Sequence, residues 1–406
     1  MADIRPFCAV RPAAGLADKI AALPYDVYNR EEACKIVEQN PLSFLRIDRA
    51  ETNFENSVST YAPEVYDKAK ELIESMIENG EFVEDTDSCY YIYRLTMNGR
   101  AQSGIVACAS IDDYCNNVIM KHENTREEKE LDRIRHIDTT SCQTGPIFLA
   151  FRDVATISNI MEEEEAKAPL YCFTAEDGVE HCIWKIIDPE NNMKLQTAFH
   201  MMDKIYIADG HHRCASAVKV GLQRRKEGII QESDYFLSVL FPESELKILD
   251  YNRVLKDLNG KTVDDILEEL KEHFVIETSD QAVSPSKKGE FGMILDDKWY
   301  RITIKEEYMN DDPVEGLDVS LLQDYVLNPV FGIENPKTDN RIDFVGGIRG
   351  LGELERRNKL DCSAAFSMYP TSIEELFAVA DDGKLMPPKS TWFEPKLRSG
   401  LFIHRI

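Results

Sequence analysis

Hydrophobic residues recur at helical and strand-like spacings in the first part of the chain. Between residues 61 and 79 apolar side chains return every three or four positions and Gly80 follows, which predicts a helix with a glycine stop. Residues 90–96 and 104–111 are apolar runs on either side of Asn98-Gly99, a pair that favours the tight turn of a β-hairpin. The pattern therefore predicts mixed α and β structure from the start.

Capping boxes mark three helix starts elsewhere in the chain. In such a box a hydroxyl or amide side chain stands three residues before an acid, and each side chain bonds the other residue's backbone N–H. Asp318 is expected to cap a further helix, and the acidic run 162–165 is interpreted as the solvated face of another. The three boxes are Asn29 with Glu32, Thr262 with Asp265, and Ser372 with Glu375.

The most informative local pattern is a strand, a turn and a helix around residue 209. Residues 204–208 are strand-like, Asp209-Gly210 follows as a turn, and a helix is expected over 213–220 with Gly221 at its end. Because the elements along the chain do not alternate as strict βαβ units, we expect an α+β protein with mixed sheets, not a doubly wound parallel sheet. A soft boundary near residue 245 separates the first portion, 1–245, from a second α/β portion, 246–406.

Composition narrows the classes of function. The 406 residues include 47 Lys and Arg against 73 Asp and Glu, a net charge of −26 that disfavours nucleic-acid binding. No apolar run approaches the roughly 18 residues that span a bilayer, and the start lacks an apolar leader segment, so a cytoplasmic protein without a membrane partner is expected. The ten cysteines include no C-x-x-C pair, so neither a disulfide framework nor a zinc knuckle is indicated. The sequence defines no oligomeric state.

The segment Asp209-Gly210-His211-His212-Arg213 is the best candidate for chemistry. A strand that ends in Asp-Gly and enters a helix aims unpaired backbone N–H groups at one point, and Gly210 lets a ligand approach that backbone closely. Arg213 adds a forked donor for phosphate oxygens, and His211 or His212 can donate to an oxyanion or move a proton. A metal centre is the weaker interpretation, since adjacent residues at a helix start point about 100° apart. Asp209 is also open to a plain N-cap role, and His211 to a hydrogen-bonded surface position.

Residues 121–136 form a second cluster of charged side chains. Arg126, Lys129, Arg133 and His136 are spaced three or four residues apart and share one face of the expected helix, where they can converge on an anion. A salt-bridged, solvated helix has the same pattern, and the residues by themselves favour that interpretation.

Two further segments each have two readings. Asp26 lies in an apolar and aromatic stretch before a helix, where it suits a general base or a Mg²⁺ ligand, or else a turn residue that satisfies local N–H groups. Residues 384–406 carry five cationic residues, one carboxylate and three prolines. That segment either clamps an anionic ligand or neutralises the protein's own acidic surface.

Four of these motifs occur in a fixed order along the chain. They are Pro24-Tyr25-Asp26-Val27, His122-Glu123-x-Thr125 with Asp132-Arg133, Ala208-Asp209-Gly210-His211-His212-Arg213, and Met386-Pro-Pro-Lys389-Ser390-Thr391. Together they resemble the domain of unknown function 1015 family, over nearly the whole chain from Arg5 to Phe402.

That family looks distantly related to free L-serine kinases and to the ParB and sulfiredoxin-like fold, whose members bind nucleotide phosphates on a glycine-containing turn at a helix start. The resemblance implies a ParB/sulfiredoxin-like nucleotide-binding core in residues 1–245. By analogy Asp26 would take the proton of the acceptor hydroxyl, although those kinases use Glu and are shorter. Glu123 would hold Mg²⁺, and Asp209, His211 and His212 would take part in catalysis. The residues implied to bind the nucleotide and its phosphates are Gly210, Arg213, His122, Thr125, Arg126, Arg133, Lys389, Ser390 and Thr391.

These expectations define a leading function and an alternative. The leading one is a kinase that moves a phosphoryl group from ATP or ADP to the hydroxyl of a small molecule, an amino acid such as free L-serine first. The alternative is a nucleotide-sensing protein on the same fold that turns over no acceptor.

Overall fold

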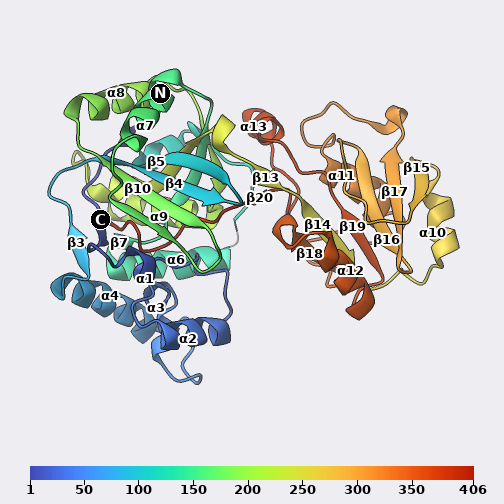
Figure 1. Ribbon diagram of the computed structural model, residues 1–406, viewed down its shortest axis with the longest axis horizontal. Helices are drawn as coiled ribbons and strands as arrows, with labels where there is room; N and C mark the ends of the chain where they lie inside the picture. Colours follow the sequence, from blue (N-terminus) through green and yellow to red (C-terminus); the bar gives the residue numbers. More distant parts are fainter. Residues whose placement is uncertain (126) are drawn as a thin grey trace. The chain divides into compact units, whose positions relative to one another are not determined.

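The chain divides into two compact units, seen in a computed structural model that describes residues 1–125 and 127–406 (Figure 1). The first unit contains residues 1–246 and 395–406, and the second contains residues 247–394. The portion expected over 246–406 thus ends with a segment that packs within the first unit. No helix among the described residues is long and apolar enough to cross a membrane.

A nine-stranded mixed sheet is the centre of the first unit. Its strands follow the order β6-β11-β8-β12-β5-β4-β10-β9, with β1 paired to β5. The pairs β6–β11 and β8–β12 are parallel and the others are antiparallel, which confirms the expected mixed sheet. The strands are β1 (Ile4–Arg5), β4 (Tyr90–Met97), β5 (Arg100–Ser110), β6 (Ile119–Met120), β8 (Ile147–Phe151), β9 (Tyr171–Thr174), β10 (Glu180–Ile186), β11 (Ile205–Asp209) and β12 (Tyr235–Pro242).

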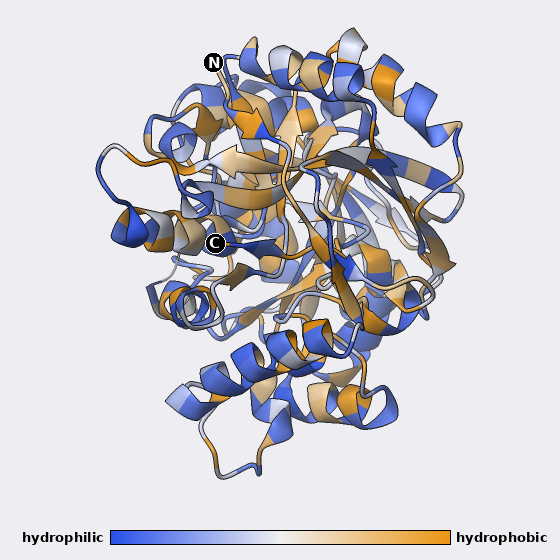
Figure 2. Ribbon diagram, turned by 90° about the vertical axis from the view of Figure 1, so that its left-hand side faces the viewer, coloured by the Kyte–Doolittle hydropathy of each residue, from blue (hydrophilic) through white to orange (hydrophobic). Residues whose placement is uncertain are grey.

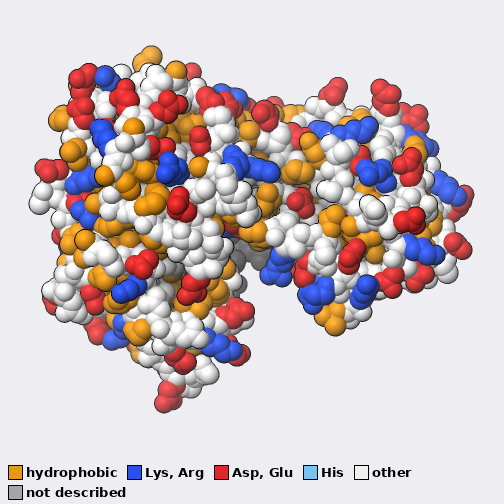
Figure 3. Space-filling model, in the orientation of Figure 1, with side chains coloured by type: hydrophobic (Ala, Val, Ile, Leu, Met, Phe, Trp, Pro, Cys, Tyr) orange, Lys and Arg blue, Asp and Glu red, His pale blue; other side chains and the backbone are white. Residues whose placement is uncertain are grey.

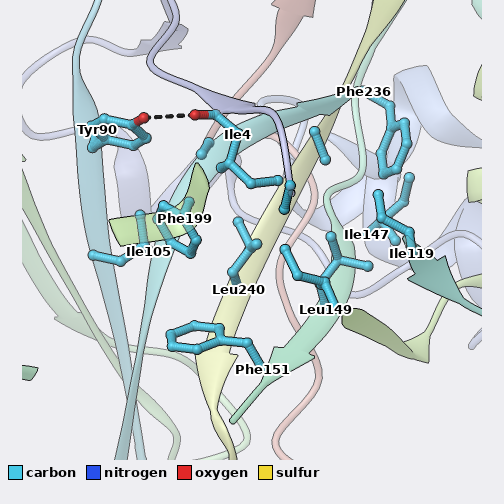
Figure 4. Close-up of a cluster of buried hydrophobic side chains, with 14 of the residues drawn as sticks. Ile4, Tyr90, Ile105, Ile119, Ile147, Leu149, Phe151, Phe199, Phe236 and Leu240 are labelled. Atoms are coloured by element: carbon cyan, nitrogen blue, oxygen red, sulfur yellow. Dashed lines mark hydrogen bonds between the residues drawn. The ribbon is translucent and has the colours of Figure 1, made fainter. Parts of the chain in front are cut away.

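Helices surround this sheet and bury its hydrophobic side chains. Strands in the middle of the unit are mainly hydrophobic, and outward sides of the surrounding helices are hydrophilic (Figure 2). Phe151, Phe199 and Leu240 belong to a large cluster of buried residues, and within it the Tyr90 hydroxyl donates to the Ile4 carbonyl 2.8 Å away (Figure 4). The helices are α1 (Ala17–Ile20), α2 (Arg30–Gln39), α3 (Leu45–Asp48), α4 (Pro63–Glu78), α5 (Ile111–Cys115), α6 (Glu127–Thr140), α7 (Ala155–Glu165), α8 (Pro189–His200) and α9 (His211–Arg224).

The second hydrophobic cluster of the first unit lies under α2, α3 and α4 and includes residues of both chain ends. Strand β2 (Val10–Pro12) pairs with β3 (Phe82–Glu84), and β21 (His404–Arg405) pairs with β7 (Cys142–Gln143). Because Val10 also bridges Ile403, the last residues of the chain are part of this core.

The second unit is built on a six-stranded antiparallel sheet with the order β15-β17-β16-β19-β14-β18. A separate two-stranded sheet joins β13 (Ile248–Leu249) to β20 (Trp392–Phe393). The strands are β14 (Tyr251–Leu255), β15 (Phe274–Ser279), β16 (Glu290–Leu295), β17 (Lys298–Ile304), β18 (Ile342–Gly346) and β19 (Ala364–Ser367). The helices are α10 (Val263–Leu270), α11 (Asp318–Leu322), α12 (Leu351–Leu360) and α13 (Ile373–Asp381).

The local turn and capping predictions are confirmed. Asn98 and Gly99 have φ angles of 53° and 78°, the left-handed values that a two-residue hairpin turn requires between β4 and β5. All three capping boxes are formed, at the starts of α2, α10 and α13.

Two carboxylates differ from their predicted roles. Asp318 is the first residue of α11, not its cap, and its buried carboxylate accepts a hydrogen bond from the Gly289 N–H at 2.9 Å. Burial raises the pKa of Asp318 to about 7. In the acidic run, Glu162 and Glu163 are exposed as predicted, but Glu164 is buried, where it pairs with Lys167 and accepts from Asn191.

Cys172 and Cys182, directly opposite each other on β9 and β10, form a disulfide. The sequence did not indicate it because only strand pairing brings the two cysteines together.

Gly221 does not end α9, which continues to Arg224. A β-carbon at this position would lie 2.2 Å from the Ser233 carbonyl oxygen, so the glycine is required by the close approach of another backbone segment. The prediction that the helix ends at Gly221 was wrong, because the local sequence does not show that the backbone of Ser233 packs against it.

We expect Gly221→Ala to lower the free energy of unfolding by about 1–3 kcal/mol, the usual range for overpacking, because backbone must shift to admit the methyl group. Chemical denaturation measures the change. Gly352→Ala in α12 is the matched control, since no atom lies within 4 Å of its β-carbon position and alanine favours helix. Equal losses in both variants would contradict the packing explanation.

Candidate functional site

The chain turns from β11 into α9 at Gly210. Glycine is the residue type that adopts the left-handed backbone conformation of this position without strain. Gly210 has a φ of 92°, and the pairing of β11 with β8 shifts register just before it, between Ile207 and Asp209. No side chain caps the start of α9. The start of this 14-residue helix thus has no side-chain cap, and the positive end of the helix dipole is directed at the turn.

The Arg213 guanidinium lies against this turn. A β-carbon at Gly210 would be 3.0 Å from Nη2 of Arg213, and one at Gly145 would be 3.4 Å from Nη1. Nη1 also donates to the Pro146 carbonyl at 2.7 Å. The guanidinium is thus fixed between two glycines beside the helix start, where the sequence predicted a phosphate contact.

Asp209 is held as a carboxylate by Lys396. The Lys396 ammonium lies 2.9 Å from Oδ2, and the Gly210 N–H donates to Oδ1 at 2.8 Å. Desolvation works against the charge, but Lys396, Arg213 and the Gly210 N–H together hold the pKa of Asp209 well below its ordinary value. Asp209 is accordingly an anchoring group at neutral pH and carries no proton to donate.

The basic C-terminal segment, residues 384–406, forms ion pairs within the protein. Several of its cations pair with the protein's own acids: Lys396 with Asp209, Arg398 with Asp177, Arg405 with Glu84, and Lys384 with Asp312. Among the described residues the segment therefore neutralises internal and surface carboxylates, and it does so at the glycine turn itself.

His122 and His211 form a buried pair beside the turn. Their ring centroids are 4.4 Å apart in an edge-to-face arrangement, and the His122 backbone N–H points at Nε2 of His211 from 3.4 Å. Burial lowers the pKa of His122 to about 4 and that of His211 well below its ordinary value, so both imidazoles are neutral at pH 7. With Nε2 as the acceptor, the His211 proton is on Nδ1, which faces Glu123 Oε2 at 4.0 Å.

The other residues of the His122 motif lie around the start of α6. Glu123 is 45% exposed, and Thr125 hydrogen-bonds Glu130, which pairs with Lys219 of α9. The His212 carbonyl accepts the Ser216 hydroxyl at 2.7 Å inside α9. Arg126 and the side chain of Lys129, two members of the predicted basic face, lie outside the described part of the chain.

The helix face with Arg133 and His136 is buried, which corrects the solvated-face interpretation. Arg133 and His136 are both less than a tenth exposed, whereas the apolar Leu131 is 46% exposed. The Arg133 guanidinium lies 4.0 Å from the centre of the Tyr25 ring and pairs with Asp132 at 2.7 Å. Because α6 packs on both α4 and α9, Arg133 and His136 point inward and line a pocket.

That pocket adjoins the glycine turn through Arg213. Its polar lining includes Asp48, whose Oδ1 accepts the Thr144 hydroxyl at 2.8 Å, and His136, whose pKa burial lowers to about 4. No local pattern indicated Asp48 or Thr144, because only tertiary packing brings them into one pocket with Arg133. The lining residues are Pro24, Tyr25, Asp48, Arg133, His136, Ile137, Gln143, Thr144, Gly145, Ile147, Arg213, Ala217, Leu237 and Ser399.

Asp26 lies in the turn that follows the pocket wall. Tyr25 lines the pocket, and Asp26 next to it is exposed. The turn is closed by a hydrogen bond from the Val27 N–H to the Pro24 carbonyl at 3.0 Å. Arg49 fixes it by donating to the carbonyls of Tyr25 and Tyr28 at 3.2 and 2.9 Å. The fold thus holds the backbone of Asp26 at the pocket's border, and its role as a base remains a prediction.

Lys389, Ser390 and Thr391 belong to the second unit, so their contact with a nucleotide also stays a prediction. Lys389 has a φ of 61°, and its ammonium lies 5.4 Å from the centre of the Tyr251 ring. Its carbonyl accepts from Arg253 at 3.0 Å, while the buried Ser390 hydroxyl donates to the Pro387 carbonyl at 2.7 Å.

The turn between β11 and α9 has the features of an anion site. An uncapped helix start, a left-handed glycine and a fixed guanidinium are suited to an anion. Mg²⁺ binding by Glu123 stays a prediction, because no group of three metal-ligating side chains found among the described residues includes Glu123 or Asp209.

The fold and this turn define a mixed α/β protein with a candidate anion site at a helix start. The chain belongs to the family described as "Protein of unknown function (DUF1015)", whose profile matches residues 4–320. This confirms the resemblance, and three of its four motifs lie inside the matched region.

Comparisons with other proteins are more distant. No curated protein matches the chain. A solved structure of a free serine kinase in complex with AMP is 18% identical, with a TM-score of 0.34, and the match covers 71% of this chain and 86% of that chain. A C-terminally truncated SbnI from Staphylococcus aureus is 13% identical, with a TM-score of 0.36 and coverages of 71% and 82%. A conserved hypothetical protein from Pyrococcus furiosus is 18% identical, with a TM-score of 0.33 and coverages of 73% and 93%.

The buried histidines predict a loss of stability in mild acid. Their folded pKa lies below the ordinary 6.5, so the unfolded chain binds protons first, and the stability present above pH 6.5 is lost as pH falls towards 4. For His122 the full effect is roughly 3 kcal/mol. Urea denaturation between pH 7.5 and 4.5 should show a shallower slope for His122→Gln. The exposed His200→Gln should keep the wild-type slope, and identical slopes in all three proteins would contradict the assignment.

Proposed function

We propose that this protein is a nucleotide-dependent small-molecule kinase, which transfers a phosphoryl group from ATP or ADP to a hydroxyl group, with free L-serine as the first acceptor to test. The observation that carries the proposal is the uncapped start of α9 after Gly210, with Arg213 fixed against it and a pocket adjoining Arg213. Phosphoryl transfer asks the protein mainly for positioning and charge neutralisation, and this turn supplies both.

Each group near the turn has a role that its chemistry allows. Backbone N–H groups of α9 and the Arg213 fork receive phosphate oxygens, and Lys396 keeps Asp209 ionised beside them. In the transfer, the bond from the terminal phosphorus to its bridging oxygen breaks and a bond to the acceptor oxygen forms. Asp26 takes the hydroxyl proton.

The neutral histidines act as hydrogen-bond groups in this proposal. His211 presents its Nδ1 proton on the side of Glu123, and His212 follows it in the first turn of α9. Mg²⁺, held by Glu123, would neutralise phosphate charge. As neutral imidazoles, His122 and His211 orient a phosphate by donation and do not add positive charge to it.

Phosphorus NMR tests the activity directly. Purified protein is incubated with ATP or ADP, Mg²⁺ and pooled free amino acids, and the expected product is a new phosphomonoester. We expect Asp26→Asn to reduce its rate at least 100-fold, within the usual contribution of a general base, without loss of nucleotide binding. Tight nucleotide binding with no ester from any acceptor would instead favour the nucleotide-sensing alternative.

Arg213→Ala should weaken ADP and AMP binding at least tenfold, because a charge-assisted, forked contact to phosphate is lost. Calorimetry of nucleotide binding measures this. Arg224→Ala is the matched control, since it removes the same charge from the last turn of the same helix, where the side chain pairs with Asp138. Equal affinities for the Arg213→Ala variant and the wild type would place the nucleotide elsewhere.

A further inference from the structure

A second pocket lies beside Arg133. It shares four lining residues with the first pocket: Tyr25, Asp48, Arg133 and His136. The second pocket does not include Arg213, and it adds Arg49, Glu51, Tyr66 and Asp132. We call it the acidic pocket, because three carboxylates and two guanidinium groups line it.

The two pockets differ in the sign of the charge that is in excess among their lining residues. The first pocket has Arg133 and Arg213 against the single carboxylate of Asp48. In the acidic pocket the carboxylates of Asp48, Glu51 and Asp132 outnumber the guanidinium groups. A ligand that spans both pockets therefore meets positive charge beside the glycine turn and negative charge at its other end.

Two of the three carboxylates already have cationic partners. Arg49 pairs with Glu51 at 2.6 Å, and Arg133 pairs with Asp132 at 2.7 Å. The second oxygen of Asp132 accepts the Tyr66 hydroxyl at 2.8 Å. These pairs make the walls of the pocket electrically balanced, apart from Asp48.

Asp48 is the one of these three carboxylates with no ion pair among the described residues, although the charge of Arg133, which pairs with Asp132, also interacts with it. It is 4% exposed, it lines both pockets, and its contact is the neutral Thr144 hydroxyl at 2.8 Å on Oδ1. No ion pair joins it to a lysine or arginine among the described residues. Its position is rigid, because Leu45 and Ile47 of the short helix α3 are fully buried beside it. A buried carboxylate that has a free oxygen and shares its nearest guanidinium with another acid can accept a further positively charged donor.

We propose that the acidic pocket binds the primary ammonium group of a small hydroxylated amine, and that Asp48 receives it. The hydroxyl end of the ligand then lies in the first pocket, on the side of Arg213. The orientation of the hydroxyl rests on the proposed kinase function, whereas ammonium binding at Asp48 does not. The neutral His136, which lines both pockets, adds no competing positive charge.

Calorimetry with matched ligands and the full chain tests ammonium binding without any turnover. The probes are ethanolamine against ethylene glycol, and L-serine against glycerate, because each pair differs by an ammonium group exchanged for a hydroxyl. We expect each amine to bind at least tenfold more tightly than its partner at pH 7. Equal binding within both pairs overturns the proposal, and this comparison needs no variant.

Asp48→Asn keeps the side-chain shape and an acceptor for Thr144 but removes the charge. We expect it to reduce the preference for amines at least tenfold and to leave ADP binding unchanged. Asp113→Asn is the control, since it changes a buried carboxylate of the same unit outside both pockets. An undiminished amine preference in Asp48→Asn overturns the assignment, as does displacement of ethanolamine by Mg²⁺ alone.

The two proposals fail in different ways. A phosphomonoester that forms on glycerate as readily as on L-serine supports the kinase and overturns the ammonium site. Amine binding that depends on Asp48, with no ester from any acceptor, supports the ammonium site and overturns the kinase.

Discussion

The absence of a side chain at Gly210 is the constraint on which the site depends. The backbone can pass from β11 into α9 at a φ of 92° only where no β-carbon collides, and the guanidinium of Arg213 occupies the space that such a carbon would approach. The same geometry leaves the start of α9 without a cap. Positive character thus accumulates at one point of a chain whose net charge is −26. On the face seen in Figure 3, acidic and basic side chains are interspersed. The positive character at the start of α9 therefore contrasts with the mixed charge on that face.

The packing of the helices around that turn also buries charged and titratable side chains. Helix α6 lies between α4 and α9, so the face that carries Arg133 and His136 turns inward. A buried guanidinium must be matched, and Asp132 and the Tyr25 ring match it. A buried imidazole avoids the cost of a buried charge in another way, because it loses its proton and becomes neutral. The first unit therefore contains a set of paired and neutral groups around its pockets, and among the described residues Asp48 differs from Asp132 and Glu51 in forming no ion pair.

Local sequence patterns predicted the elements well where the signal itself was local. The hairpin at Asn98-Gly99, the three capping boxes and the strand, turn and helix around Gly210 depend on residues within a few positions of one another, and all of them are present. Gly221 shows the opposite case, since its role depends on Ser233 twelve positions later and on how the two segments approach. The candidate site divides in the same way. Gly210 and Arg213 could be found from their spacing, whereas Asp48, Thr144 and the partnership of Asp209 with Lys396 required the tertiary fold.

Lys396 shows why the end of the chain matters to a site near its middle. Residues 395–406 follow the second unit in the sequence and belong to the first unit. The second unit begins near β13 and ends near β20, and these two strands pair with each other. Its two ends are therefore close together, so an inserted unit of this kind does not separate the two segments of the first unit. Ile403 then bridges Val10 and Ser399 bridges Ala22, which fixes the returning segment in the core. With those bridges in place, the Lys396 ammonium reaches Asp209 across 187 residues of sequence and completes the charge balance at the glycine turn.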